Sequence, residues 1–158
     1  MPLNHYTFRS VWEVAAPFDE VCAVLWDVET YAVWWPEIRS VLQLGGSRHE
    51  MVARSFLPYK LRFVSEDRTS DRASGLIDAA LSGDLEGTVR WTVTPQGEGC
   101  RLVYDQEVVT NKRLLNVLAP IARPGFRFNH TLMMRHGEAG LQTFLAGASW
   151  ARDGITRT

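Results

Sequence analysis

Hydrophobic and polar residues alternate along HYTFRSVWEV, residues 5–14. Successive side chains of a strand point to opposite faces of its sheet, so this alternation predicts a strand that is buried on one side only. Arg9 and Glu13 would lie on the solvent side. The opposite, largely apolar face would carry Tyr6, Phe8, Ser10, Trp12 and Val14.

The spacing becomes helical in APFDEVCAVLWDV, residues 16–28. Val21, Val24 and Leu25 recur every three or four residues and form one apolar stripe, as expected for a helix that packs on a core. Pro17 favours the first turn of such a helix, where its missing N–H group is not needed. The segment therefore predicts a short amphipathic helix directly after the first strand.

Two adjacent tryptophans, Trp34 and Trp35, end the next segment, ETYAVWW, residues 29–35. This segment predicts a second short helix that stops before Pro36, because the residue before a proline is disfavoured in the α conformation. Neighbouring side chains on a helix point about 100° apart. We therefore expect one indole to pack beneath the short helices and the other to face elsewhere. A plain structural role for both rings is the alternative.

Six short segments rich in β-branched and aromatic residues follow, separated by turn residues such as Gly45, Gly46, Pro58 and Gly83. Short connections between consecutive strands favour antiparallel pairing. The pattern therefore predicts a meander, with about seven strands once the first is included. The six segments are residues 39–46, 51–57, 59–67, 73–81, 85–95 and 100–110.

Helical spacing returns in the last third of the chain. Pro120 and Pro124 interrupt residues 111–125, which predicts one or two helical turns and then a break. No proline occurs from Phe126 to about Leu145, and this stretch predicts one long amphipathic helix. Its inward sector would carry Phe126, His130, Met133, Gly137, Leu141 and Phe144, flanked by Asn129, Met134 and Gly140.

Composition and charge exclude several classes of protein. The 158 residues suffice for one domain with a substantial core, spanning residues 1–158. The formal net charge of −1 provides no excess of positive charge for nucleic acid. Charged residues in the first twenty positions leave no signal-peptide core, and no apolar run reaches the roughly 20 residues that cross a bilayer. We expect a cytoplasmic protein without an integral membrane segment.

The sequence contains no motif that is typical of a metal-binding or nucleotide-binding site. Cys22 and Cys100 lack metal-ligand spacing and are expected to be reduced, buried thiols. His130 and His136 are six residues apart, which places them on different sides of a helix, so we expect no zinc site. No phosphate-binding glycine motif or serine-nucleophile motif occurs. We therefore expect neither a metal nor a cofactor.

The order strand, two short helices, six strands and long C-terminal helix resembles the START/Bet v 1-like superfamily (SRPBCC), which includes the polyketide cyclase/dehydrase and lipid-transport proteins. The resemblance extends over nearly the whole chain. It implies the α+β helix-grip fold, in which a curved antiparallel sheet of about seven strands wraps around the C-terminal helix. The segments that carry it are residues 11–38, 82–105 and 127–141.

The resemblance also implies an internal cavity between sheet and long helix, with a volume of a few hundred Å3. Trp34 and Trp35 directly precede the second strand, and we expect one of them to face the mouth of this cavity. Ordinary core packing is the alternative for the aromatic residues of the set, such as Trp91. The predicted ligand-binding residues are Trp34, Trp35, Phe56, Tyr59, Phe63, Trp91, Tyr104, Phe126, His130, Met133 and Met134.

His130 and Tyr104 are the candidate catalytic residues. His130 lies in the apolar sector of the long helix, where a neutral imidazole needs a hydrogen-bond partner or water. A hydrogen-bonded core residue is the alternative to a ligand-binding or acid–base role. The hydroxyl of Tyr104 also needs a partner if it is buried. Arg62, between two apolar strand residues, is expected on the convex face of the sheet.

Two functions remain open at this point, together with a third that uses the same groove for a protein partner. We favour a binder of a hydrophobic small molecule, such as a lipid, an isoprenoid or a polyketide-like aromatic. The alternative is a polyketide cyclase or dehydratase that uses His130 as acid–base catalyst. An enzyme is expected to place two titratable groups near one point, whereas the sequence offers one good candidate. The protein is expected to be a monomer or a homodimer.

Overall fold

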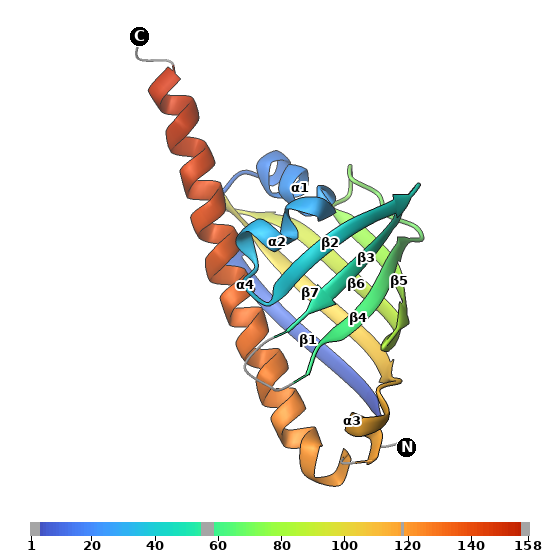
Figure 1. The fold of residues 1–158 in the computed structure, drawn as a ribbon. Helices are drawn as coiled ribbons and strands as arrows, with labels where there is room; N and C mark the ends of the chain where they lie inside the picture. The colour runs from blue at the N-terminus through green and yellow to red at the C-terminus, as the bar shows by residue number, and fades with distance from the viewer. Residues whose placement is uncertain (1–3, 55–58, 118, 156–158) are drawn as a thin grey trace.

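The computed structural model describes residues 4–54, 59–117 and 119–155 of the chain. Its elements follow the predicted order, and the α+β helix-grip fold is confirmed (Figure 1). In chain order they are β1 (His5–Val14), α1 (Phe18–Trp26), the 3-10 helix η1 (Val28–Thr30), α2 (Tyr31–Trp34), β2 (Ile38–Gly45), β3 (Arg48–Ala53), β4 (Leu61–Asp67), β5 (Leu76–Gly83), β6 (Leu85–Gln96), β7 (Gly99–Thr110), α3 (Arg113–Val117) and α4 (Ala119–Ile155).

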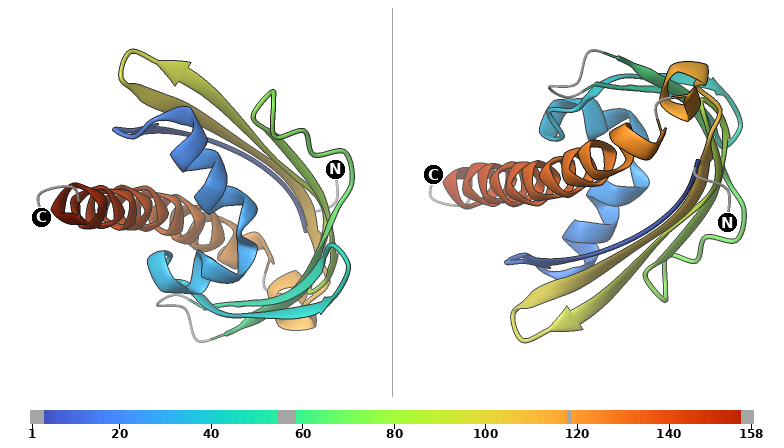
Figure 2. Two further views of the ribbon diagram at one scale, coloured as in Figure 1. Left: turned by 90° about the horizontal axis from the view of Figure 1, so that it is seen from above. Right: turned by 90° about the horizontal axis from the view of Figure 1, so that it is seen from below.

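The seven strands of the described residues form one antiparallel sheet in the order β1-β7-β6-β5-β4-β3-β2. Consecutive strands from β2 to β7 are neighbours, which confirms the predicted meander, and β1 returns to pair with β7. The longest pairing joins β6 and β7 from Leu85 opposite Thr110 to Gln96 opposite Gly99. The sheet curves around the helical elements on its concave side (Figure 2).

The short helices between β1 and β2 cover one end of the space inside the curved sheet (Figure 2). α2 is a single helical turn that ends at Trp34, and Trp35 already has an extended backbone, as expected for the residue before Pro36. The Tyr31 hydroxyl donates a 2.7 Å hydrogen bond to the Leu25 carbonyl oxygen. This bond joins α2 to the end of α1 and so fixes the position of the segment that carries the two tryptophans.

The C-terminal helix begins earlier than the sequence predicts and also ends later. α4 starts at Ala119 and continues through Pro124 to Ile155, whereas the sequence predicts a start at Phe126. Pro120 lies in the first turn, where no backbone N–H makes an intrahelical bond, so it costs the helix nothing. Pro124 follows one turn later and removes one backbone hydrogen bond. The structure has a short helix α3 before α4, and the helix α4 is not broken at Pro120 or Pro124.

α4 passes along the open side of the sheet and protects the free edge of β1. Strand β1 is an edge strand, so the N–H groups on its outer side have no strand partner. The N–H of Glu13 donates a 2.9 Å hydrogen bond to a carboxylate oxygen of Glu138, and the N–H of Ala15 donates one of 3.1 Å to the amide oxygen of Gln142. Side chains of α4 thus bind the end of this edge strand and fix the position of the helix.

Candidate functional site

A cavity of about 130 Å3 lies between the concave face of the sheet and α4. Its lining comes from η1, α2, strands β2 to β7 and α4. The volume is smaller than the predicted few hundred Å3, because aromatic rings and methionines fill much of the space between sheet and helix. An apolar cavity of about 150 Å3 holds one benzene molecule. This cavity is therefore close to the size of a single aromatic ring.

Most of the predicted ligand-binding residues lie together around this cavity. Those that line it are Trp35, Phe63, Trp91, Tyr104, Phe126, His130, Met133 and Met134. Trp34 and Tyr59 are not part of the lining; both pack against the core instead. Phe56 is outside the described residues. The structure thus brings eight of the eleven to one cavity, and their contact with a ligand remains a prediction.

Of the two adjacent tryptophans, one lines the cavity and the other packs against the first. The indole N–H of Trp35 donates a 2.9 Å hydrogen bond to the Met133 carbonyl oxygen on α4, so this ring is held as part of the cavity wall. Trp34 stacks on the outer side of it, with ring centroids 5.5 Å apart and planes at 16°. Both rings are buried. Trp35 is therefore the one that faces the cavity.

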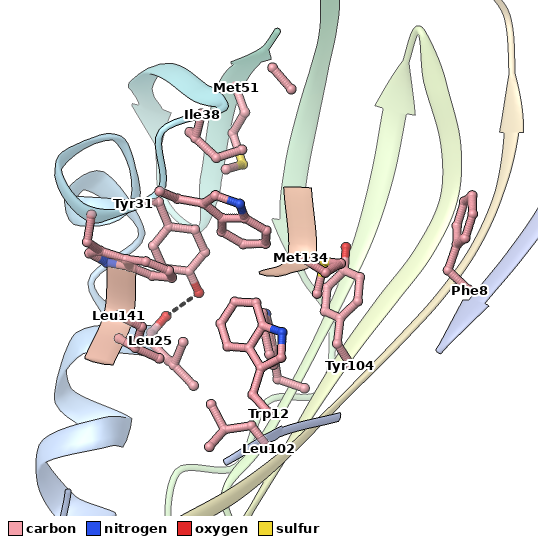
Figure 3. Packing of buried hydrophobic residues seen from close by; sticks show 14 of the residues in the cluster. Phe8, Trp12, Leu25, Tyr31, Ile38, Met51, Leu102, Tyr104, Met134 and Leu141 are labelled. Carbon is pink, nitrogen blue, oxygen red and sulfur yellow. Dashed lines mark hydrogen bonds between the residues drawn. The ribbon is translucent and has the colours of Figure 1, made fainter. Parts of the chain in front are cut away.

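Strands β6 and β7 supply an aromatic wall opposite α4. Trp91 and Tyr104 are directly paired across these strands, and their ring centroids lie 4.7 Å apart. The Trp91 ring also contacts Trp12 of β1 edge to face at 4.8 Å. Trp12 of β1 and Tyr104 of β7 extend into the same buried cluster as Met134 of α4 (Figure 3). Large rigid rings of this kind give an apolar surface at little cost in side-chain entropy.

One edge of the cavity is polar and is centred on Gln106 of β7. The hydroxyl of Tyr104 donates a 2.9 Å hydrogen bond to the Gln106 amide oxygen, and His130 Nε2 lies 3.0 Å from the same oxygen. An amide oxygen only accepts, so His130 carries its proton on Nε2. The imidazole also stacks on Phe8, with centroids 3.7 Å apart and planes at 8°. Tyr104, Gln106 and His130 form the polar edge.

Burial moves the pKa values of both titratable groups of the polar edge away from neutrality. Removal from water lowers the pKa of His130 to about 4, because the charged imidazolium loses its solvation without gaining an anionic partner. The same loss of solvation raises the pKa of Tyr104 well above its usual value. At pH 7 His130 and Tyr104 are therefore both neutral, and they offer hydrogen bonds without charge.

Lowering the pH will destabilise the protein through its buried His130 imidazole. Between pH 7 and pH 4.5 the wild type will lose about 2 kcal/mol more unfolding free energy than the His130→Gln variant. The unfolded chain binds a proton on His130 near its ordinary pKa of 6.5, whereas the folded state resists protonation down to about 4. The contribution of the neutral, buried His130 to the unfolding free energy is therefore complete above pH 6.5 and is lost as the pH falls toward 4. Urea unfolding of both proteins at both pH values measures the difference; equal losses would contradict this burial.

Besides Ser65, the polar lining residues Gln106 and Asn129 were not predicted as site residues. Gln106 is two residues from Tyr104 on β7, so strand alternation alone places it on the same concave face. Asn129 flanks the inward sector of α4; it is buried, and its amide nitrogen lies 3.7 Å from the sulfur of Met133. For both residues, the position on the strand or helix was the only sequence feature that indicated a side chain facing the cavity. Their polar side chains argued against a place in an apolar lining.

The remaining candidate groups lie away from the cavity. His136 Nδ1 contacts a carboxylate oxygen of Glu37, and this pair joins the turn after α2 to α4. Arg62 lies on the convex face as predicted, with its guanidinium 2.7 Å from Glu50. Cys22 and Cys100 are buried free thiols, as predicted. Within the described part of the chain, no three His, Cys, Asp or Glu side chains are grouped so that they could hold a metal ion.

Residues 5–141 match the family described as polyketide cyclase / dehydrase and lipid transport. The chain belongs to this family. The matched range contains the whole cavity lining, and the resemblance to START/Bet v 1-like proteins is confirmed. The family includes both catalysts and carriers, so membership alone does not separate an enzyme from a binder. No curated protein matches the chain in sequence.

Solved structures share this fold at low sequence identity. A conserved protein from Geobacillus kaustophilus is 14% identical, with a TM-score of 0.75 over 90% of this chain and 97% of that one. The aromatase/cyclase Zhui from Streptomyces sp. R1128 is 17% identical, with a TM-score of 0.73 over 90% and 94%. A START superfamily protein from Mycobacterium smegmatis is 18% identical, with a TM-score of 0.72 over 90% and 98%. At these identities the likeness establishes the fold alone.

Proposed function

We propose that the protein binds a hydrophobic small molecule, from the lipids, isoprenoids and polyketide-like aromatics, in the cavity between α4 and the sheet. The observation that carries the proposal is the combination of an apolar cavity lining with one polar edge, formed by Tyr104, Gln106 and His130. Such a site gains affinity by burying the apolar part of a ligand. Its few polar groups then orient a single carbonyl or hydroxyl group of that ligand.

The size of the cavity favours a ligand whose buried end is about one ring wide. Met133 and Met134 line the cavity on the helix side. Methionine is unbranched and changes rotamer at little cost, so these two side chains are the ones best able to move for a longer ligand. The aromatic wall of Trp91 and Tyr104 is fixed by strand pairing and does not offer this freedom.

The competing function, a cyclase or dehydratase with His130 as acid–base catalyst, is supported by the hydrogen bonds that link His130 and Tyr104 through Gln106. General acid–base catalysis is most efficient when the pKa of the catalytic group is near the working pH. The pKa of His130, at about 4, is far below neutrality, and that of Tyr104 is far above it. The described lining contains no carboxylate, lysine or arginine. These features favour a binder.

Replacing His130 with Gln will test the polar edge with two probes of similar shape, 4-methylphenol and toluene. The phenol has the hydroxyl group that toluene lacks. We expect the variant to weaken binding of 4-methylphenol by at most about 1.5 kcal/mol, the range of one neutral hydrogen bond. Toluene should bind both proteins equally, because it makes only apolar contacts. Isothermal titration calorimetry measures all four affinities.

The same variant separates the two functions. With a poly-β-keto substrate, a cyclase would lose turnover by about 100-fold while binding survives, because general acid–base help would be gone. A binder shows no turnover in either protein. If 4-methylphenol and toluene lose affinity equally in His130→Gln, the polar edge does not orient the ligand. If neither probe saturates the wild type, the binding proposal itself fails.

A further inference from the structure

The net charge of −1 conceals an uneven distribution of charge along the chain. Between residues 108 and 137 the sequence has five lysines and arginines and no aspartate or glutamate. This segment contains α3 and the first half of α4, which form one end of the molecule (Figure 1). We call it the cationic end. Its five cations are Lys112, Arg113, Arg123, Arg127 and Arg135.

Three of the five cations of this end form no ion pair with a carboxylate among the described residues. Arg113, Arg127 and Arg135 are exposed. Lys112 is partly offset by Asp84, whose carboxylate lies 3.8 Å from its ammonium group. The guanidinium of Arg123 lies 4.7 Å from the centre of the Tyr6 ring and donates a hydrogen bond to the His5 carbonyl oxygen. The cationic end therefore has a positive potential in a protein that is slightly acidic as a whole.

Large apolar side chains are exposed among these cations. Val117, Ile121 and Phe128 have exposed fractions of 76%, 83% and 62%. Ile121 and Phe128 are seven residues apart on α4 and face the same way, and Arg135 follows at the same spacing. His130 lies on the opposite side of this stretch of α4 and faces the cavity. The outer face of the first half of α4 thus carries apolar and cationic side chains together, an arrangement typical of helices that lie on membranes.

We propose that the cationic end docks on a membrane surface that contains anionic lipids. Lysine and arginine next to exposed apolar groups combine attraction to anionic headgroups with insertion of side chains among the lipids. Val117 and Ile121 belong to helices at a protruding end of the fold (Figures 1 and 2). A protein helix would need an apolar groove to receive it, so a flat lipid surface fits this end better. No helix among the described residues is long and apolar enough to cross a bilayer, so the contact is peripheral.

Docking at this end has a consequence for the cavity. Phe126, Asn129 and Met133 line the cavity from the stretch of α4 that carries Ile121 and Phe128 on its outer side. A membrane bound there lies one helix diameter from the cavity, about 10 Å. The docking proposal stands without the ligand proposal, because it is tested with vesicles alone.

Cosedimentation of the full chain with vesicles tests the proposal. We expect binding to vesicles of equimolar phosphatidylglycerol and phosphatidylcholine that is at least about tenfold stronger than binding to phosphatidylcholine alone. Raising the ionic strength from about 0.05 to about 0.5 M should weaken it several-fold, because salt screens charges at a surface. Ile121→Asp should reduce it at least about tenfold. This residue is in the first turn of α4, where an acidic side chain stabilises the helix, so the fold is retained.

The matched control is Leu42→Asp, which adds the same charge at another exposed apolar residue, 59% exposed on strand β2. It should leave vesicle binding within about twofold of wild type. The proposal is overturned if the folded wild type does not bind anionic vesicles, or if Ile121→Asp and Leu42→Asp have equal effects. Binding of DNA at the cationic end without binding to vesicles would also overturn it, because the exposed apolar side chains would then have no part in the contact.

Discussion

Replacing Gly140 with alanine will lower the free energy of unfolding by about 3 kcal/mol or more, at the upper end of the range for overpacked cores. A Cβ at this position would overlap the carbonyl oxygen of Trp34, which belongs to the backbone of α2 and has no rotamer to change. α4 would have to move away from α2. The indole of Trp35, which binds the Met133 carbonyl on α4, would then lose its place in the cavity wall. Urea unfolding followed by circular dichroism measures the loss.

The control is the same substitution seven residues later on the same helix. A Cβ added at Gly147 would have no atom within 4 Å, so alanine meets open space there. Alanine favours a helix over glycine by about 1 kcal/mol, and Gly147→Ala should therefore stabilise the protein slightly. Equal effects of the two substitutions would contradict the close approach of α4 to α2.

The periodicity of the sequence predicts the order of the elements, and the resemblance to START/Bet v 1-like proteins implies how they pack in the helix-grip fold. Strand β1 has the predicted bounds, and the predicted turns at Gly45, Gly46 and Gly83 separate strands of the meander, whereas Pro58 lies outside the described residues. The predicted start of α4 was wrong. Sequence pattern treats every proline as a helix break, whereas Pro120 lies in the first turn of α4, which tolerates proline. Local pattern thus identifies elements reliably and their ends less well, because ends depend on which backbone groups need partners.

The candidate site was predictable only in part. Helical and strand spacing placed His130 and Tyr104 on inward faces, and both line the cavity. Spacing could not tell Trp35 from Trp34, because that depends on how the chain turns at Pro36 and on a hydrogen bond to α4. Nor could it reveal the partner of His130, since Gln106 comes from a strand 24 residues earlier. Long-range contacts of this kind appear only once the sheet closes around the helix.

Filling the cavity will abolish binding of a ring-sized ligand. Ala79 on β5 is buried and lines the cavity, so Ala79→Phe places a phenyl ring where the ligand would lie. We expect the affinity for 4-methylphenol to fall at least about 100-fold, about 2.7 kcal/mol. The neighbouring residue Ala80 points to the other face of the sheet. Ala80→Phe therefore adds the same ring to the same strand outside the cavity and should bind 4-methylphenol like the wild type.

The most direct test of a ligand-binding cavity is a calorimetric titration of 4-methylphenol into wild type, Ala79→Phe and Ala80→Phe, each first shown to be folded by its thermal transition. The cavity between α4 and the sheet predicts saturable one-to-one binding to the wild type and to Ala80→Phe, and none to Ala79→Phe. Absence of saturable binding to the wild type, or equal affinity in all three proteins, would contradict it.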